Sequence, residues 1–439
     1  MTGKRIRVGY HTLGCKVNQY DTEAMRELFQ ASGYETVPFD GKADVFVINT
    51  CTVTGTGDKK SLQLIRRCHR RFPEADIIVT GCLAQRDAES VSLPGVALVL
   101  GTQRRGEVVT LYEQAKREGQ RIVAVDSLKQ AAFERLNVRN HAEHTRAVMK
   151  IQEGCNRYCT YCVIPYVRGP IRSCPPDEIG AEARRLAEAG FQEIVLTGIH
   201  LTSYGRDLPG SLSLCDAVRA VQDVPGVVRI RLGSLEPVIV TPEFLSGMRA
   251  CDKLCPQFHL ALQSGSDRIL AAMRRRYTAE EFLSACRLLR EAYPDATLTT
   301  DVMTGFPGET EEDYLETVRV CREAGFARMH VFPYSERRGT KAAELPGSVP
   351  VPVREARAVQ LIETGKELEQ EALHSFVGKT VRVLVEETDG VHGLGYTDGY
   401  LRARVTGGCC PGEVVSSRVV GVSGGQLITE RTHEQEAES

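Results

Sequence analysis

The sequence predicts an α/β fold in three parts: an N-terminal doubly wound parallel sheet, a central partial barrel of six βα units and a small C-terminal antiparallel β-barrel. Apolar runs of four to six residues alternate with helical patterns of 10–15 residues, which favours parallel sheets. A helical pattern then covers 352–374, and short apolar runs broken by glycines follow it. A chain of 439 residues has room for roughly two to four domains.

The first part, residues 1–125, is predicted to form the doubly wound sheet. Amphipathic patterns at 21–32 and 58–71 predict helices between its strands. The strands are predicted at 6–10, 45–48, 77–80 and 96–100.

The second part, residues 140–372, follows a polar segment at 128–144 that we interpret as a linker. A capping box at Thr278 and Glu281 marks the start of one of its helices. Six βα units are too few for a closed eight-stranded barrel, so we expect an open barrel with its chemistry at the carboxyl ends of the strands. The strands are predicted at 148–151, 194–197, 228–232, 258–261, 297–302 and 328–332.

The third part, residues 373–437, is predicted to form the antiparallel barrel. Its first strand is predicted at 381–386, and glycines interrupt the later runs. Small barrels of this kind often bind nucleic acid. The last residues, 433–439, are predicted to be a disordered acidic tail.

The cysteine content indicates metal or redox chemistry. The chain has 15 cysteines, an odd number, with no apolar run of 18 residues and no signal-peptide pattern. We therefore expect a cytoplasmic protein without a membrane span, where a reducing environment argues against a disulfide framework. Residues 1–140 carry 21 Lys and Arg against 16 Asp and Glu, so a polyanionic partner would meet this part.

Cys155, Cys159 and Cys162 place three thiols within eight residues, directly after a predicted strand. Structural zinc sites usually take four ligands in two paired motifs, and His144 and Cys174 lie 11 and 12 residues away. Three thiolates suit a four-iron cluster that keeps one iron open for a ligand. The alternative is three buried or zinc-bound cysteines.

Cys15, Cys51 and Cys82 each lie one to five residues beyond a predicted strand. The carboxyl ends of parallel strands share one edge of a sheet, so three distant cysteines can converge there. Taken singly, each cysteine is a typical small core residue. Their repeated position after a strand favours a second three-thiolate site.

These motifs together resemble a known family. The Cys-x3-Cys-x2-Cys motif, which directly follows Gly154, resembles the cysteine motif of the radical S-adenosylmethionine (SAM) enzymes. Its combination with the second cysteine set, and with a terminal barrel similar to the TRAM module, resembles the methylthiotransferases. Residues 12–23, 49–54, 258–265 and 275–278 resemble the branch that acts on N(6)-threonylcarbamoyladenosine in tRNA.

The resemblance implies two 4Fe–4S clusters and SAM as cofactors. The cluster on Cys155, Cys159 and Cys162 would bind SAM and cleave it reductively. The auxiliary cluster would carry the sulfur that becomes a methylthio group on carbon 2 of the adenine at tRNA position 37. The auxiliary ligands would be Cys15, Cys51 and Cys82. The implied SAM contacts are Thr197, Gly198, Ser234, Glu236, Gln263 and Val302.

The resemblance also implies partners and leaves alternatives. The partners are a tRNA substrate, an electron donor such as flavodoxin or ferredoxin, and a sulfur source that the sequence does not identify. The alternatives are the same chemistry on isopentenyladenosine in tRNA or on a ribosomal-protein aspartate, and a non-catalytic iron–sulfur or zinc protein that binds RNA. Candidate phosphate contacts are Arg66, Arg67, His69, Arg70, Arg71 and the run 274–276.

Overall fold

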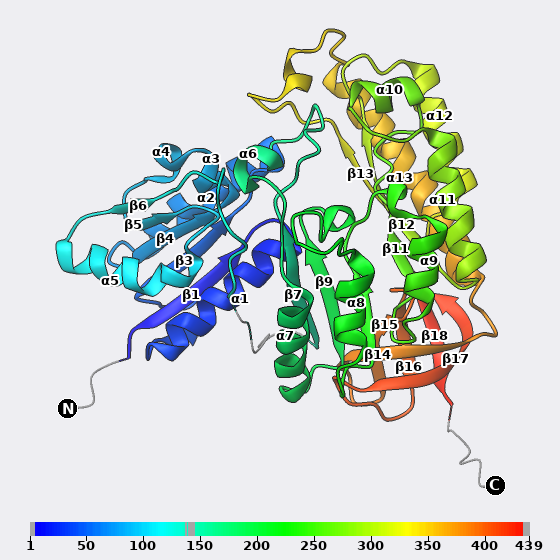
Figure 1. Cartoon of the computed structure of the whole chain (residues 1–439), viewed down its shortest axis with the longest axis horizontal. Helices are drawn as coiled ribbons and strands as arrows, with labels where there is room; N and C mark the ends of the chain where they lie inside the picture. The colour runs from blue at the N-terminus through cyan, green and yellow to red at the C-terminus, as the bar shows by residue number, and fades with distance from the viewer. Residues whose placement is uncertain (1–4, 137, 139–144, 433–439) are drawn as a thin grey trace.

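The computed structural model describes residues 5–136, 138 and 145–432, which form three parts (Figure 1). The predicted acidic tail at 433–439 lies outside the described residues, as do 137 and 139–144 of the predicted linker. The N-terminal sheet lies beside the central strands, and the C-terminal barrel covers one end of them. Among the described residues, no helix has both the length and the apolar character needed to cross a bilayer.

The N-terminal part contains the predicted parallel sheet. Its six strands run in the order β2-β1-β3-β4-β5-β6, and every neighbouring pair is parallel. The order reverses between β1 and β3, which is where open α/β sheets bind ligands. The sequence pattern misses β2 and β6, because three residues are too few to show a period. The strands are β1 (Arg7–Thr12), β2 (Glu35–Val37), β3 (Val45–Thr50), β4 (Asp76–Gly81), β5 (Val96–Leu100) and β6 (Ile122–Ala124).

Helices cover both faces of this sheet, as a doubly wound fold requires. On one face, Met25 of α1 packs with Val47, and on the other Leu64 of α2 packs with Phe46. The first helix begins at Lys16, five residues before its predicted start, because the buried polar Asn18 hides the apolar period. The helices are α1 (Lys16–Ala31), α2 (Gly55–Arg71), α3 (Cys82–Arg86), α4 (Ala88–Val91) and α5 (Val108–Glu118).

The central part has the six predicted parallel strands in an open arrangement. One sheet has the order β10-β9-β7-β8 and the other β11-β12-β13, and a parallel bridge between Leu235 and Leu260 joins them. The two-residue strand β8 pairs antiparallel with β7 and was not predicted. The strands are β7 (Arg146–Glu153), β8 (Arg172–Ser173), β9 (Glu193–Gly198), β10 (Arg229–Leu232), β11 (Gln257–His259), β12 (Thr297–Thr304) and β13 (Arg328–Pro333).

Alternate residues of these strands face an outer helical layer and the inside of the barrel. Ile230, Phe258 and Leu298 belong to the apolar core beneath the helices. Their neighbours Arg231 and His259 line the interior instead. The predicted capping box opens α11. The helices are α6 (Ile164–Arg168), α7 (Pro176–Glu188), α8 (Leu214–Gln222), α9 (Pro242–Arg249), α10 (Asp267–Ala272), α11 (Ala279–Ala292), α12 (Glu311–Ala324) and α13 (Val351–His374).

The C-terminal part is a closed barrel of five strands in the order β14-β15-β16-β18-β17. Four pairings are antiparallel, as predicted, whereas β16 and β18 run parallel. An odd number of strands cannot alternate in direction all the way around a closed ring, so one pair has to be parallel. The strands are β14 (Thr380–Thr388), β15 (His392–Thr397), β16 (Arg402–Thr406), β17 (Val414–Ser423) and β18 (Gln426–Arg431).

Buried ion pairs hold this barrel against the central strands. Arg229 Nε lies 2.8 Å from a carboxylate oxygen of Glu193 and 3.1 Å from one of Asp398 on the barrel. Arg146 lies over the ring of Tyr400, 4.9 Å from its centre. Buried charges are costly unless they are paired, so these contacts favour one fixed position of the barrel.

Candidate functional site

The three N-terminal cysteines lie on neighbouring loops at the carboxyl edge of the first sheet; we call them the N-terminal triad. Cys15 follows β1 and caps α1, Cys51 follows β3, and Cys82 follows β4 as the first residue of α3. Since β1 and β3 are neighbours at the reversal point of the strand order, these loops occupy the usual ligand position of such a sheet.

Close backbone packing brings the loops of this triad together. Gly14 has a φ of +106°, and a Cβ there would meet Cys51 Sγ at 3.1 Å. Gly81 has a φ of +96°, and a Cβ there would meet Thr50 O at 2.5 Å. Only glycine allows these loops to approach so closely.

The other three cysteines, which we call the central triad, lie on the loop after β7. Gly154 precedes them with a φ of +74°, and a Cβ at this position would meet Pro170 O at 1.8 Å. The backbone N–H of Cys155 donates to Gly169 O at 3.0 Å, which fixes the start of the loop. The loop therefore folds back on the chain that follows it, and it lies at the carboxyl end of the central strands.

The thiols within each triad lie close enough to affect one another. Burial and the adjacent thiols raise the pKa of Cys51 and Cys155 to about 11 and that of Cys162 to about 12. Within the described residues, no three His, Cys, Asp or Glu side chains form a group that could hold a single metal ion. Three neighbouring thiols with an N–H donor beside one sulfur fit a ligand set for an iron–sulfur cluster, because ligation replaces the thiol proton.

Each triad receives an N–H from a buried arginine. Arg168 donates its Nε–H to Cys82 Sγ at 3.3 Å, and Arg275 donates to Cys159 Sγ at 3.5 Å. Donors of this kind stabilise thiolates and tune the potential of a cluster. Arg168 ends α6, six residues after Cys162, and α6 contacts α3, which begins at Cys82. One arginine therefore joins the loop of the central triad to the N-terminal triad.

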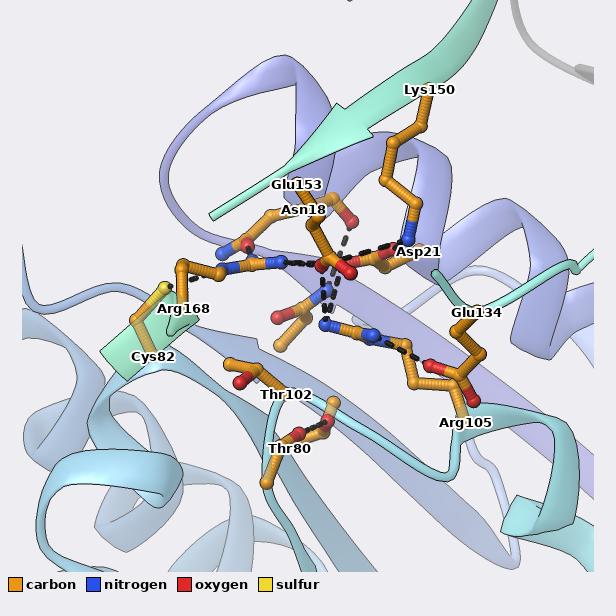
Figure 2. Close-up of polar contacts among 12 residues, drawn as sticks. Asn18, Asp21, Thr80, Cys82, Thr102, Arg105, Glu134, Lys150, Glu153 and Arg168 are labelled. Carbon is orange, nitrogen blue, oxygen red and sulfur yellow. Dashed lines mark hydrogen bonds and ion pairs between the residues drawn. The ribbon is translucent and has the colours of Figure 1, made fainter. Parts of the chain in front are cut away.

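Figure 2 shows that Arg168 belongs to a buried network of charges between the first two parts of the chain. Asp21 and Arg105 come from the N-terminal part, and Lys150 and Glu153 from the central part; all five side chains are at most 1% exposed. Lys150 Nζ lies 2.7 Å from Asp21, and Arg168 Nη1 lies 2.6 Å from Glu153. Although burial disfavours ionisation, the cations hold the pKa of Glu153 well below its ordinary value.

The charges of this network do not cancel. The three cations Arg105, Lys150 and Arg168 meet the two carboxylates of Asp21 and Glu153, which leaves one positive charge in excess. At its edge, Arg172 pairs with Glu153 and Glu134 pairs with Arg105, which adds one charge of each sign. The excess lies beside Cys82, so an anionic group at the N-terminal triad would balance it.

A second contact between the two parts fixes the loop after Cys51. Arg337, from the loop after β13, donates to Thr52 Oγ1 at 2.7 Å and pairs with Asp58 at 2.8 Å. The backbone N–H of Gly55 donates to Ser335 Oγ at 3.2 Å. The central part thus holds the loops of the N-terminal triad from two sides.

Most of the predicted SAM contacts lie at the carboxyl end of the central strands. Thr197 and Gly198 end β9, and Ser234 is exposed just after β10. Gln263 has a positive φ of 68°, and its buried side-chain oxygen has no hydrogen-bond partner within the described residues, which fits a polar group of a bound SAM. The side chain of Val302 lies in the apolar core instead, so only its backbone, paired with Gln263, is available at this edge.

The remaining predicted contact, Glu236, is the centre of a cluster of two arginines and a histidine. Its carboxylate lies 2.8 Å from Arg157, 3.0 Å from Arg275 and 3.1 Å from His200. Burial opposes its ionisation, but the hydrogen bond from His200 and the charge of Arg275 lower the pKa of Glu236 to about 2. Because Arg275 also donates to Cys159, Glu236 orients a group that touches the central triad.

The structure revises the two predicted phosphate-binding runs. Arg275 turns inward to Cys159, so only Arg274 and Arg276 of the second run are exposed, and they lie in the loop before α11. In the first run, the exposed side chains are Arg66, Arg67, Arg70 and Arg71, whereas His69 is half-buried. The sequence analysis did not predict a role for Arg168. The one local indication of a role was its position six residues after Cys162.

The central barrel encloses a cavity of about 410 Å³. It extends from Ser234 at the carboxyl end of β10 to Tyr400 of the C-terminal barrel. Lys16, the first residue of α1, lines this cavity and an adjoining one of about 370 Å³. Lys16 reaches solvent, yet the surrounding protein and the nearby charges of Arg146 and Arg231 lower its pKa to about 8, which leaves it a cation at neutral pH.

Two family models match separate parts of the chain. The Radical SAM superfamily matches residues 149–321, which contain the central triad. The Uncharacterized protein family UPF0004 matches residues 7–101, which contain the N-terminal triad. The chain is also 43% identical to the threonylcarbamoyladenosine tRNA methylthiotransferase MtaB of Bacillus subtilis, over 90% of this chain and 89% of that protein. The chain belongs to the tRNA methylthiotransferase family.

Two further methylthiotransferases show similar coverage. The chain is 38% identical to MtaB of Aquifex aeolicus, over 90% of this chain and 96% of that protein. It is also 38% identical to the tRNA-2-methylthio-N(6)-dimethylallyladenosine synthase of Thermobifida fusca, over 86% and 78% of the two chains. As a radical SAM methylthiotransferase, the chain is an enzyme that transfers a methylthio group, and the cofactors of its family are SAM and 4Fe–4S clusters.

The methylthiotransferase also shares its fold with a solved radical SAM enzyme. The methyltransferase TsrM of Kitasatospora setae, solved with cobalamin and a 4Fe–4S cluster bound, aligns with a TM-score of 0.56 over 75% of this chain and 72% of that one. At 15% identity, this likeness concerns the fold alone.

Proposed function

We propose that this methylthiotransferase adds a methylthio group to carbon 2 of N(6)-threonylcarbamoyladenosine at position 37 of tRNA. The two MtaB enzymes, whose names state this nucleoside, and residues 12–23 and 49–54 support the substrate. The observation that carries the proposal is the placement of two cysteine triads on loops joined by Arg168. A transfer that needs two cofactor sites beside one acceptor requires such a placement.

We infer that each triad holds one 4Fe–4S cluster. The central cluster would bind SAM on Cys155, Cys159 and Cys162, and the auxiliary cluster would be held by Cys15, Cys51 and Cys82. When bound, the clusters and SAM supply the electron, the radical and the methylated sulfur. The chain itself contributes position and charge: Gly154 allows the turn into the central loop, and Arg168 and Arg275 donate N–H groups to cysteine sulfurs.

The SAM site is proposed at the carboxyl end of the central strands. Glu236 would hold Arg157 and Arg275 beside the central triad and accept a hydroxyl hydrogen bond. The other proposed contacts are Thr197, Gly198, Ser234, Gln263 and the backbone of Val302. This end of the central strands faces the N-terminal part of the chain, and the two parts together would exclude water from the reacting groups.

The partners follow from the same proposal. We expect a tRNA whose phosphates meet the exposed arginines of α2, an electron donor such as flavodoxin or ferredoxin, and a cytoplasmic site of action. We assign the auxiliary cluster to a domain of residues 1–125 and the SAM cluster to a domain of residues 140–372. The RNA-binding barrel would be the third domain, residues 373–437.

Nucleoside mass spectrometry tests this proposal. The anaerobically reconstituted enzyme is incubated with SAM, a reductant and tRNA carrying threonylcarbamoyladenosine, and we expect a nucleoside heavier by one sulfur and one CH₂. Cys15→Ala should still form deoxyadenosine from SAM without modifying the tRNA, and Cys155→Ala should do neither. Cys68→Ala removes a buried cysteine outside both triads and should behave as wild type. A product on dimethylallyladenosine tRNA alone would overturn the assigned substrate.

A further inference from the structure

The cavity inside the central barrel holds unpaired positive charge. Lys16, Arg231 and Arg328 line it. Arg231 is neutralised by Glu193, whose carboxylate lies 2.9 Å from its Nε. Within the described residues, the side chains of Lys16 and Arg328 make no hydrogen bond and no salt bridge. Two cations in this cavity therefore lack a counter-ion.

Among the described residues, no carboxylate lines this cavity. Asp301 lies on β12 between two histidines of the cavity wall, with His259 Nε2 and His330 Nδ1 each 3.3 Å from its oxygens. The adjoining cavity differs, because Glu386 and Glu387 line it together with Lys16. The cavity inside the barrel therefore has an excess of positive charge on its wall, and it is open to solvent, because Arg328 and His330 are exposed.

Lys16 also lies at the meeting point of the two cofactor sites. It follows Cys15 of the N-terminal triad directly, and it shares the cavity with Ser234, a proposed SAM contact. At the other end the cavity reaches Tyr400 of the barrel that we expect to bind RNA. A group of the acceptor nucleoside that enters this cavity would therefore lie beside both cofactors while the RNA rests on the C-terminal barrel.

The proposed acceptor carries a group of complementary charge. A threonylcarbamoyl group joins threonine through its amino nitrogen, so the carboxylate and the hydroxyl of threonine remain free. A dimethylallyl group is apolar and cannot neutralise a cation. A carboxylate gains a strong charge-assisted hydrogen bond from an unpaired ammonium in a partly desolvated cavity, whereas an apolar group leaves that cation unpaired.

We propose that Lys16, assisted by Arg328, binds the threonine carboxylate of the acceptor nucleoside in this cavity and so selects N(6)-threonylcarbamoyladenosine over apolar N(6)-modified adenosines. The inference rests on the proposed function. Lys16 is a specificity residue in this scheme, and its effect is on binding of the acceptor rather than on SAM cleavage.

Binding measurements with two RNAs test this inference. One anticodon stem-loop carries threonylcarbamoyladenosine, and the other carries its threonine methyl ester, which differs only in lacking the negative charge. Fluorescence anisotropy of the reconstituted enzyme, under anaerobic conditions and at fixed salt, gives both dissociation constants. Wild type should bind the acid about tenfold more tightly than the ester, and Lys16→Met should remove this preference by weakening binding of the acid about tenfold.

Two other variants make the result specific. Arg328→Met, far in sequence from both cysteine triads, should reduce the preference in the same direction even if Lys16→Met disturbs the neighbouring cluster. Lys42→Met removes an exposed lysine just before β3, at the opposite edge of the sheet from the triads, and should keep the full preference. Deoxyadenosine formation should be unchanged in Lys42→Met.

The outcomes separate this inference from the proposed function. If wild type methylthiolates the acid RNA but binds acid and ester equally, or if both cavity variants keep the preference, the role of the cavity is wrong while the function stands. If wild type fails to methylthiolate threonylcarbamoyladenosine and modifies dimethylallyladenosine, the proposed function is wrong and the inference is overturned with it.

Discussion

Replacing Arg168 by methionine should weaken both the fold and the auxiliary centre. The change keeps an apolar stem of similar length and removes a guanidinium that pairs with Glu153 and Asp21 and donates to Cys82. Removing one partner of a buried ion pair costs about 3–5 kcal/mol. Because Lys150 and Arg105 still balance the two carboxylates, we expect a loss below that range, about 2 kcal/mol, from the lost charge-assisted hydrogen bonds.

Urea unfolding followed by circular dichroism measures this loss. Arg168→Lys keeps the charge without the planar fork and should lose about half as much. Arg319→Met is the matched control, since Arg319 is 60% exposed and pairs with Glu323 on the surface of α12, where such pairs contribute little. A loss in Arg168→Met no larger than that of Arg319→Met would refute the reasoning.

The reduction potential gives a second readout of the same residue. A positive charge beside Cys82 favours the more negative, reduced state of a cluster, so Arg168→Met should lower the potential of the auxiliary centre. The interaction energy of two unit charges about 4 Å apart is about 4 kcal/mol at an effective dielectric constant of about 20. Asp21 and Glu153 partly compensate the charge of Arg168, so we expect the reduction potential to fall by an amount on the order of 100 mV. A redox titration followed by electron paramagnetic resonance measures it, and an unchanged potential would show that Arg168 has only a structural role.

Three further changes test other parts of the structure. Gly154→Ala should lose iron from the central triad, because the added Cβ has no room where φ is +74°. The control Gly106→Ala adds a Cβ in open space, so an iron assay should find its full iron content. Burial raises the pKa of Glu182 from 4.5 to about 7, so folding favours the protonated carboxyl, and stability is lost as the pH rises from about 4.5 to 7. Glu182→Gln should therefore raise the free energy of unfolding by about 3 kcal/mol at pH 8 and by less at pH 5.5; an equal gain at both pH values in urea unfolding would contradict this. Arg229→Met removes a buried partner of Asp398, so limited proteolysis should cut faster between α13 and β14 while the central strands stay resistant.

The parts of the structure that the sequence predicts are those with local signals. The six parallel strands of the central part, their helices and the capping box at Thr278 each produce a pattern within one segment. The position of Cys51 and Cys82 at one sheet edge follows for the same reason, since a residue just beyond a parallel strand reaches the carboxyl edge.

The remaining features depend on residues that lie far apart in the chain. Arg168 and Asp21 are 147 positions apart, and only the packing of two folded parts brings them together. Arg275 looked like a member of an exposed basic run, because a run of arginines does not reveal which member turns inward. The side chain of Val302 entered the core because alternate residues of a strand face opposite sides, and its register could not be fixed from sequence alone.

The buried charges around Arg168 limit how this enzyme can be recombined. Asp21 and Arg105 lie in one structural part, and Lys150, Glu153 and Arg168 in the other, so neither part alone contains the whole network. A chimera that joined the first 125 residues of one relative to the remainder of another would bring together two charge patterns that had never been matched. The smallest segment that can be exchanged therefore extends past the domain boundary, through the end of α6.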